Sequence, residues 1–310
     1  MIPLFDAHCD TLMMLEFAKL PVGSLGKNKF HVDLERLGGY APSAQFFAIF
    51  GMEQMMPGGD IFDRLYSRFI AEVSVNSERM QFCKSAADAE KAAAANKVAA
   101  FLSVEGAFIL KDGERLEEAY EKGVRMLTLT WNNANGISGT NTEDTELGLT
   151  QKGKELVRRC QRMGVIVDLS HISERGFWDT VEIAQKPVIA SHSNSAAVHK
   201  HSRNLSDEQL RALRDIGGVT GLNLYGQFLG GDSMDDCLRH IEHILDVGGE
   251  SVLALGGDLD GCDQLPAGIT GSDGWASIFN ALSDRGYPKP LLDDIFYNYL
   301  MRVVRNKCDM

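Results

Sequence analysis

Ile2-Pro3-Leu4-Phe5-Asp6-Ala7-His8-Cys9-Asp10 is a short, mostly apolar run that ends in two side chains able to bind a metal ion, those of His8 and Asp10. Residues two apart in a β-strand point to the same face, so His8 and Asp10 can reach one ion while Cys9 points away. A single His-x-Asp triplet at a strand end is common, and alone it fits an ordinary turn as well as a metal site.

Four further segments repeat this arrangement of a strand-like run followed by a histidine or an acidic residue. They are Val98–Ser103 before Glu105, Val165–Leu169 before His171, Pro187–Ala190 before His192, and Val252–Leu255 before Asp258. In a parallel α/β barrel the carboxyl ends of the strands converge on one face, where such enzymes build their active sites. Five structural coincidences at the same end of five strands are less plausible than one shared site.

The alternation of strands and helices predicts the fold class. Eight strands are expected to begin near Pro3, Ala44, Val98, Arg125, Val165, Pro187, Gly218 and Val252. Helices are expected over Ile61–Phe82, Gly113–Lys122, Thr150–Met163, Glu174–Ala184, Ser206–Asp215 and Met234–Asp246, and Ser206 with Gln209 reads as a capping box. This order predicts an α/β protein, a (β/α)8 TIM-type barrel, with Gly274–Cys308 as a C-terminal helical extension. Because no linker-like stretch interrupts it, residues 1–310 are expected to form a single hydrolase barrel domain.

Composition and charge argue against several classes of partner. The formal net charge of -12 disfavours nucleic acid and anionic membrane surfaces, which both attract basic patches. No apolar stretch approaches ~20 residues, and no basic leader precedes the first strand. Six cysteines without a Cys-x-x-Cys pair are typical of free thiols in a reducing compartment. We therefore expect a cytoplasmic protein.

The types of side chain at the strand ends predict a site for two metal ions. Histidine nitrogens and carboxylate oxygens suit Zn²⁺, with Mn²⁺ or Fe²⁺ as alternatives, and need no thiolate. His8 and Asp10 would bind one ion, His171 and His192 the second, and Glu105 would bridge the two. Two such ions could hold a shared hydroxide as the nucleophile and polarise a scissile carbonyl.

Asp258 is the expected proton shuttle between that water and the leaving amine, which makes amide hydrolysis the natural chemistry. Asp260 competes for this role, but Asp258 directly follows the apolar run. Taken singly, Glu105 could be a salt-bridged barrel residue, and a lone histidine is more often a hydrogen-bonded core residue than a ligand. His240 and His243 are expected on the solvated surface of an amphipathic outer helix.

Seven sequence motifs together resemble the membrane dipeptidase (renal dipeptidase) family, whose members share a binuclear zinc α/β barrel. The matching pieces are Asp6–Asp10, Ser103–Gly106, Arg125–Thr130, Val167–Ser173, Pro187–Ser193, Ser202–Asn204 and Gly256–Gly261. The resemblance implies the same five metal ligands that the residue types and their positions predict: His8, Asp10, Glu105, His171 and His192. It also implies that Arg203 binds the carboxylate at the C-terminal end of the substrate, which a planar guanidinium can grip with paired hydrogen bonds.

The chain departs from the family pattern at one position. The mammalian relatives carry a histidine where this chain has Trp131, followed by Asn132. Asn132 or Asn135 could supply the missing hydrogen-bond donor, with Trp131 as an apolar wall of the substrate site. The chain is also expected to lack the leader and lipid-anchor signals of those relatives, so membrane attachment is not implied.

We therefore expect a metal-dependent dipeptidase that uses two Zn²⁺ ions, with dipeptides, including those with a D-residue at the C-terminal position, as substrates. The family implies a homodimer. One alternative is another barrel amidohydrolase that acts on lactones, cyclic amides or phosphotriesters. A second is a metal-binding scaffold without catalysis, although a scaffold has no need of a proton shuttle such as Asp258.

Overall fold

Eight parallel strands form a closed barrel in the computed structural model, which describes residues 1–54 and 57–308. The barrel strands are β1 (Leu4–Cys9), β2 (Ser43–Ile49), β4 (Val98–Glu105), β5 (Val124–Thr128), β6 (Ile166–Asp168), β7 (Ile189–Ala190), β8 (Val219–Leu222) and β9 (Leu253–Leu255). Each pairs with the next along the chain, β9 pairs with β1, and β2 pairs directly with β4. The predicted TIM-type barrel and its eight strands are confirmed.

One expected helix is shorter than predicted. The segment expected to be helical over Ile61–Phe82 divides into α3 (Ile61–Val75) and a ninth strand, β3 (Met80–Phe82). β3 pairs with β4 alone and lies outside the closed barrel. The helix ends at Val75, and the next residue, Asn76, donates to the carbonyl oxygen of Glu72 through both its backbone N–H and its side-chain amide.

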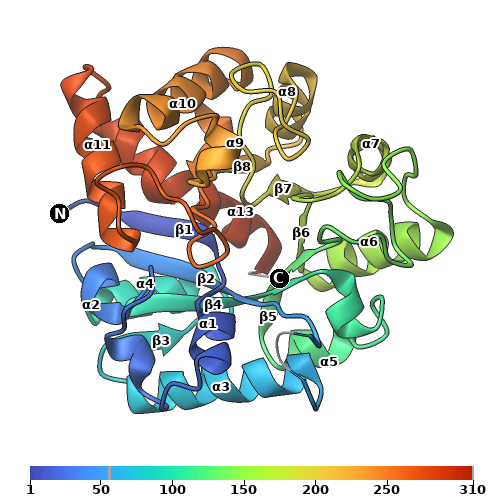
Figure 1. Cartoon of the computed structure of the whole chain (residues 1–310), viewed down its shortest axis with the longest axis horizontal. Helices are drawn as coiled ribbons and strands as arrows, with labels where there is room; N and C mark the ends of the chain where they lie inside the picture. Colours follow the sequence, from blue (N-terminus) through green and yellow to red (C-terminus); the bar gives the residue numbers. More distant parts are fainter. Residues whose placement is uncertain (55–56, 309–310) are drawn as a thin grey trace.

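Helices surround the barrel in the order expected for repeated strand–helix units (Figure 1). They are α1 (Thr11–Phe17), α2 (Leu34–Leu37), α4 (Ala86–Ala94), α5 (Leu116–Glu121), α6 (Gln151–Met163), α7 (Glu174–Ile183), α8 (Asp207–Asp215), α9 (Gly226–Leu229) and α10 (Met234–Gly248). The predicted capping box at the start of α8 is present, because Ser206 and Gln209 exchange side-chain hydrogen bonds with each other's backbone N–H. The C-terminal extension consists of α11 (Trp275–Asp284), α12 (Lys289–Asp293) and α13 (Tyr299–Cys308), with a π-helical turn before α13.

Apolar side chains fill the amino-terminal half of the barrel. The rings of Phe5, Phe46 and Phe101 stack with centroids 5.1–5.6 Å apart. Met301 and Val304 of α13 belong to the same buried cluster, so α13 closes this end of the barrel. The packed end fixes the strands, and the polar side chains lie at the opposite, carboxyl end.

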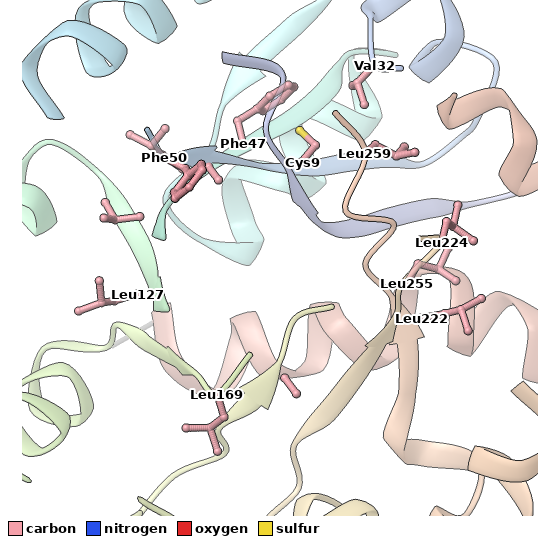
Figure 2. Packing of buried hydrophobic residues seen from close by; sticks show 14 of the residues in the cluster. Cys9, Val32, Phe47, Phe50, Leu127, Leu169, Leu222, Leu224, Leu255 and Leu259 are labelled. Carbon is pink, nitrogen blue, oxygen red and sulfur yellow. The ribbon is translucent and has the colours of Figure 1, made fainter. Parts of the chain in front are cut away.

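The outer faces of the strands pack against the surrounding helices in a second apolar cluster, part of which Figure 2 shows. In this view Leu222 and Leu255 lie side by side on paired strands, β8 and β9. The strands approach so closely here that a Cβ atom on Gly221 or Gly256 would stand 1.9 or 1.7 Å from the carbonyl oxygen of Ser191. Glycine at both positions lets the short strand β7 join the barrel.

The described part of the chain contains no helix that is long and apolar enough to cross a membrane. Five cysteines have free thiols buried in the protein: Cys9, Cys83, Cys160, Cys237 and Cys262. The side chain of the sixth, Cys308, lies outside the described residues.

Candidate metal centre and active site

Four strand ends bring the five predicted ligands together at the carboxyl end of the barrel. His8 and Asp10 come from β1, Glu105 from β4, His171 from the end of β6, and His192 from the end of β7. Their exposed fractions lie between 0% and 7%. These ligands are up to 184 residues apart in the sequence, and only barrel closure makes them neighbours.

Glu105 lies at the centre of this cluster with its two oxygens turned to different sides. Oε2 is 3.5 Å from Nε2 of His8. Oε1 is 3.1 Å from Nε2 of His171 and 3.6 Å from Nε2 of His192. The carboxylate therefore stands between two groups of donors, as a bridging ligand would.

Three sets of donor atoms within 4.8 Å of one another have the composition of a metal site. They are His8 with Asp10 and Glu105, Glu105 with His171 and His192, and His8 with His192 and Asp258. Burial raises the pKa of Asp10 and raises that of Glu105 to about 7, because an ionised carboxylate is poorly solvated inside the barrel. A bound cation would offset this penalty and keep both groups ionised.

His171 and His192 each direct Nδ1 toward a polar side chain and Nε2 toward the other ring. Burial lowers the pKa of His171 and His192 well below the usual value, and the nearby charges of His8 and Arg203 act in the same direction, which disfavours protonation of both rings. Nδ1 of His171 is 2.8 Å from Oδ1 of Asn132, and Nδ1 of His192 is 2.7 Å from Oγ of Ser191. The two Nε2 atoms face each other at 3.0 Å, where their lone pairs can converge on a cation.

His8 differs from the other two histidines in its surroundings. Burial lowers the pKa of His8, but the carboxylates of Glu105 and Asp10 outweigh this effect and raise it well above the usual value. Within the described part of the chain, neither ring nitrogen of His8, nor Oδ1 of Asp10, makes a hydrogen bond, although these atoms are buried and Nε2 lies 3.5 Å from carboxylate oxygens of Asp10 and Glu105. Buried polar atoms without partners are costly, and a metal ion at this position would satisfy them.

The backbone is strained at two of the site residues. His171 and Asp258 have φ angles of 70° and 55°, in the left-handed region that residues other than glycine seldom adopt. Such conformations persist where the surrounding structure holds them, and they are concentrated at functional sites.

Asp258 and Asp260 have different surroundings, although only one residue separates them. Oδ1 of Asp258 is 3.9 Å from Nε2 of His8, and its Oδ2 accepts a hydrogen bond from the amide of Asn223. The carboxylate of Asp260 accepts from the hydroxyl of Thr11 at 2.6 Å and from the backbone N–H of His31 at 2.7 Å. Asp258 therefore faces the candidate metal ligands, whereas Asp260 holds the start of α1 and the segment around His31.

Arg203 lies buried beside the cluster, with 4% of its surface exposed. Its guanidinium donates to the carbonyl oxygen of His192 at 3.0 Å and to Oγ of Ser193 at 3.3 Å, while its Nε has no hydrogen-bond partner among the residues that the structure describes. A cavity of about 600 Å³ opens next to Arg203 and His171. The walls of this cavity are partly apolar, with Leu169 and Phe177 among them.

Trp131 and Asn132 follow β5 and lie against His171. The Trp131 ring is 6.3 Å from the His171 ring and 5.0 Å from that of Phe50, centroid to centroid. Asn132 contacts a predicted ligand through its side-chain oxygen, and its amide nitrogen can still act as a donor. The side chain of Asn135 is bound within its own loop, to Leu129, Ile137 and Ser138.

Two residues that contact the predicted site residues or their neighbours, Asn223 and Asp168, were not predicted from the sequence. Asn223 follows β8, the one late strand to which no site residue had been assigned, and it contacts both Asp258 and the carbonyl oxygen of His192. Asp168 is buried in β6 and contacts Ser191. Their position at strand ends was the available signal, but polar residues are common there.

His240 was expected on the solvated surface of an outer helix, but the structure buries it. It is fully buried on the inner face of α10, where its Nδ1 accepts from the backbone N–H of Ser195 and its Nε2 lies 3.1 Å from the carbonyl oxygen of Leu229. Burial lowers its pKa to about 4. His243, one turn on, is partly exposed and contacts Asp207 at 2.8 Å.

Comparisons with known proteins agree with this geometry. The family model described as "Membrane dipeptidase (Peptidase family M19)" matches residues 1–309. An uncharacterised protein encoded in the pqqA 5' region of Klebsiella pneumoniae is 35% identical over 248 residues, which cover 76% of this chain and 91% of that protein.

Two solved structures are similar over their whole length. One is a metallo peptidase from Rhodobacter sphaeroides bound to a phosphinate mimic of the dipeptide L-Ala-D-Ala, with a TM-score of 0.89, 27% identity and 99% coverage of both chains. The other is the dipeptidase AC, also of family M19, with a TM-score of 0.88, 28% identity, and coverage of 100% of this chain and 99% of that one.

A parallel α/β barrel with clustered histidines and carboxylates at its carboxyl end defines the class of metal-dependent barrel hydrolases. Within that class, the match over nearly the whole chain assigns the family: the protein belongs to the membrane dipeptidase family, peptidase family M19. The predicted family and hydrolase class are confirmed.

Proposed function

We propose that the protein is a metal-dependent dipeptidase that hydrolyses the single peptide bond of dipeptides, including those with a D-residue at the C-terminal position. The observation that carries this proposal is Glu105, whose two oxygens face two separate groups of donor atoms. Its family membership and the dipeptide mimic bound by the Rhodobacter sphaeroides relative support the same substrate class.

We propose Zn²⁺ at both positions, with Mn²⁺ or Fe²⁺ compatible with the same ligands. His8, Asp10 and Glu105 would hold one ion, and Glu105, His171 and His192 the other. The unpartnered buried atoms of His8 and Asp10 support a fit between these residues and a cation. When bound, the ions supply Lewis acidity toward the scissile carbonyl and make a water molecule acidic enough to attack at neutral pH.

In this proposal Asp258 moves the proton. Its Oδ1 accepts a proton from the attacking water and later delivers it to the amine that leaves. Asn223 donates to the other oxygen of Asp258, which fixes the orientation of the carboxylate. The position of Asp258, 3.9 Å from a ligand nitrogen of His8, supports contact with the reacting atoms.

Arg203 would select dipeptides over longer chains. A buried guanidinium next to the metal cluster can bind the terminal carboxylate of a substrate whose scissile bond lies one residue away. A longer peptide has its carboxylate too far along the chain to satisfy both contacts. The unpartnered Nε of Arg203 offers a further donor for that carboxylate.

The test is the release of amino acids from a panel of L,L- and L,D-dipeptides by zinc-loaded protein, with tripeptides and C-terminally amidated dipeptides for comparison. We expect release from free dipeptides alone, and loss of release with a chelator. Arg203→Met should raise KM roughly 10- to 100-fold, because hydrogen bonds to charged groups contribute about 1.5–3 kcal/mol. Arg211→Met, on the exposed face of α8, is the matched control.

Release from no dipeptide by protein that binds its metal ions would refute the proposal. That outcome would favour a scaffold without catalysis, or an amidohydrolase for lactones or cyclic amides. Equal rates on free and amidated dipeptides would remove the role of Arg203 while leaving peptidase activity in place.

A further inference from the structure

Asp168 occupies a fully buried position behind the metal cluster, at the end of β6. Its carboxylate accepts four hydrogen bonds. Two come from backbone N–H groups, those of Ser170 at 3.0 Å and Ser191 at 2.7 Å. Two come from hydroxyls, those of Thr128 and Ser191, both at 2.6 Å. A carboxylate with four donors around it is firmly fixed in orientation.

The hydroxyl of Ser191 connects this carboxylate to a predicted metal ligand. A serine hydroxyl has one hydrogen to donate and two lone pairs. Oδ2 of Asp168 takes that hydrogen, because a carboxylate oxygen can only accept. Oγ of Ser191 is also 2.7 Å from Nδ1 of His192, and toward this atom it must act as the acceptor. Nδ1 of His192 therefore carries the ring proton.

The position of this proton decides which atom of His192 can bind a metal ion. A neutral imidazole with its proton on Nδ1 has its free lone pair on Nε2. Nε2 is the atom that faces the cluster, 3.6 Å from Oε1 of Glu105 and 3.0 Å from Nε2 of His171. If Ser191 instead donated to Nδ1, the proton would lie on Nε2 and block the ligand atom.

We propose that Asp168 is a positioning residue that acts through the hydroxyl of Ser191 to hold His192 in the tautomer and orientation required of a metal ligand. The arrangement is a carboxylate–histidine–metal triad with a serine inserted between carboxylate and ring. The inference rests on the proposed metal centre, but it makes a statement about the metal-free protein that does not depend on the substrate.

The direct test is the tautomer of His192 in the metal-free protein, read from long-range ¹H–¹⁵N NMR spectra of protein labelled at histidine and assigned with His192→Gln. We expect the proton on Nδ1 in the wild type. In Ser191→Ala we expect this preference to be lost and zinc affinity, measured against a competing chelator, to fall about 10- to 100-fold.

Ser195→Ala is the matched control. Its hydroxyl is equally buried and, among the described residues, has no hydrogen-bond partner, so its removal leaves the contacts from Asp168 through Ser191 to His192 in place. We expect this variant to keep the wild-type tautomer and to bind zinc within about threefold of the wild type. Asp168→Asn, if it folds, should resemble Ser191→Ala, because an amide can donate to Ser191 and reverse the hydroxyl.

A wild-type ring with its proton on Nε2 would overturn the inference, even if no variant folds. Zinc binding by Ser191→Ala that is as tight as in the wild type would overturn it as well. Because neither readout uses turnover, a protein that hydrolyses no dipeptide can still show the tautomer effect. An active dipeptidase can equally fail to show it, so the two proposals are tested separately.

Discussion

Oδ1 of Asn132 lies 2.8 Å from Nδ1 of His171. This contact joins the loop after β5 to a predicted ligand at the end of β6 and fixes the direction in which the imidazole points. The sequence departs from its mammalian relatives at the neighbouring Trp131, and Asn132 was expected to donate to the substrate. The structure directs its oxygen toward the ring nitrogen, which gives Asn132 a contact with a predicted metal ligand, and its Nδ2 can still donate to a substrate.

Asn132→Ala is expected to weaken metal binding about 10- to 100-fold, because partners of ligand histidines contribute by that factor in other metal sites. The measurement is a zinc titration against a chelator of known affinity. Asn133→Ala, at an exposed position one residue further, is the control and should bind as the wild type does. Unchanged affinity in Asn132→Ala would show that the contact with His171 does not affect the ligand.

Asp258→Asn is expected to lower kcat by about 10²- to 10⁴-fold, because an amide cannot accept the proton of the attacking water. Its metal content and melting temperature should stay close to the wild type. Asp260→Asn should have the reverse effect, with a lower melting temperature, because the carboxylate that holds Thr11 and His31 is lost. Steady-state kinetics and thermal unfolding of both variants decide the matter. A fully active Asp258→Asn enzyme would remove this residue from the mechanism.

Removal of the metal ions is expected to destabilise the protein. Asp10, Glu105 and Asp258 then lie close together in a buried site without a compensating charge. Saturation with zinc at about 1,000 times Kd should add about 4 kcal/mol to the free energy of unfolding. This corresponds to a rise of several degrees in melting temperature, measured with and without a chelator. The rise should be largely lost in His192→Gln, and an equal rise in that variant would place the bound zinc elsewhere.

The contribution of His240 to the stability of the metal-free protein is expected to fall as the pH drops through the range from about 6.5 to 4. Burial lowers the pKa of His240 to about 4 in the folded state, so below the ordinary value of 6.5 the unfolded chain takes up a proton that the folded chain refuses. Each unit of difference in the pKa of His240 between the folded and unfolded states is about 1.4 kcal/mol, so this histidine lowers the free energy of unfolding by roughly 2–3 kcal/mol between pH 7.5 and 4.5.

The measurement for His240 is denaturant unfolding at several pH values, compared with His240→Gln in the same buffers. Other groups titrate in both proteins, so the difference between the two curves isolates the histidine. We expect the wild type to lose more stability than the variant on acidification. Parallel curves would contradict a neutral, buried His240.

Gly256→Ala is expected to destabilise the barrel by several kcal/mol or to prevent folding. A Cβ atom there would stand 1.7 Å from a backbone oxygen of β7's end, which cannot move without disturbing the strand pairing. Gly268→Ser, at a surface turn where the added Cβ meets nothing within 4 Å, is the control for a general loss of glycine flexibility. Its φ of 84° predicts only a modest loss, and urea unfolding of both variants compares them.

The amino-acid sequence by itself determined the barrel and the identity of its chemical groups. Apolar runs that alternate with amphipathic segments predicted the strands and helices. The predicted site residues lie at or just after the ends of these strands: His8, Glu105, His171, His192 and Asp258. The sequence also placed the capping box of Ser206. The predicted length of α3 was too great, because no local sequence pattern indicates that Met80–Phe82 pairs with β4.

Tertiary structure alone decided how these groups face one another. The distances around Glu105 depend on barrel closure, and the contacts of Asp260 depend on partners more than 200 residues away, Thr11 and His31. The burial of His240 and the chain from Asp168 through Ser191 to His192 depend on packing between elements. Local periodicity records which face of a strand or helix is apolar. Hydrogen-bond partners from distant segments are set only when the whole chain has folded.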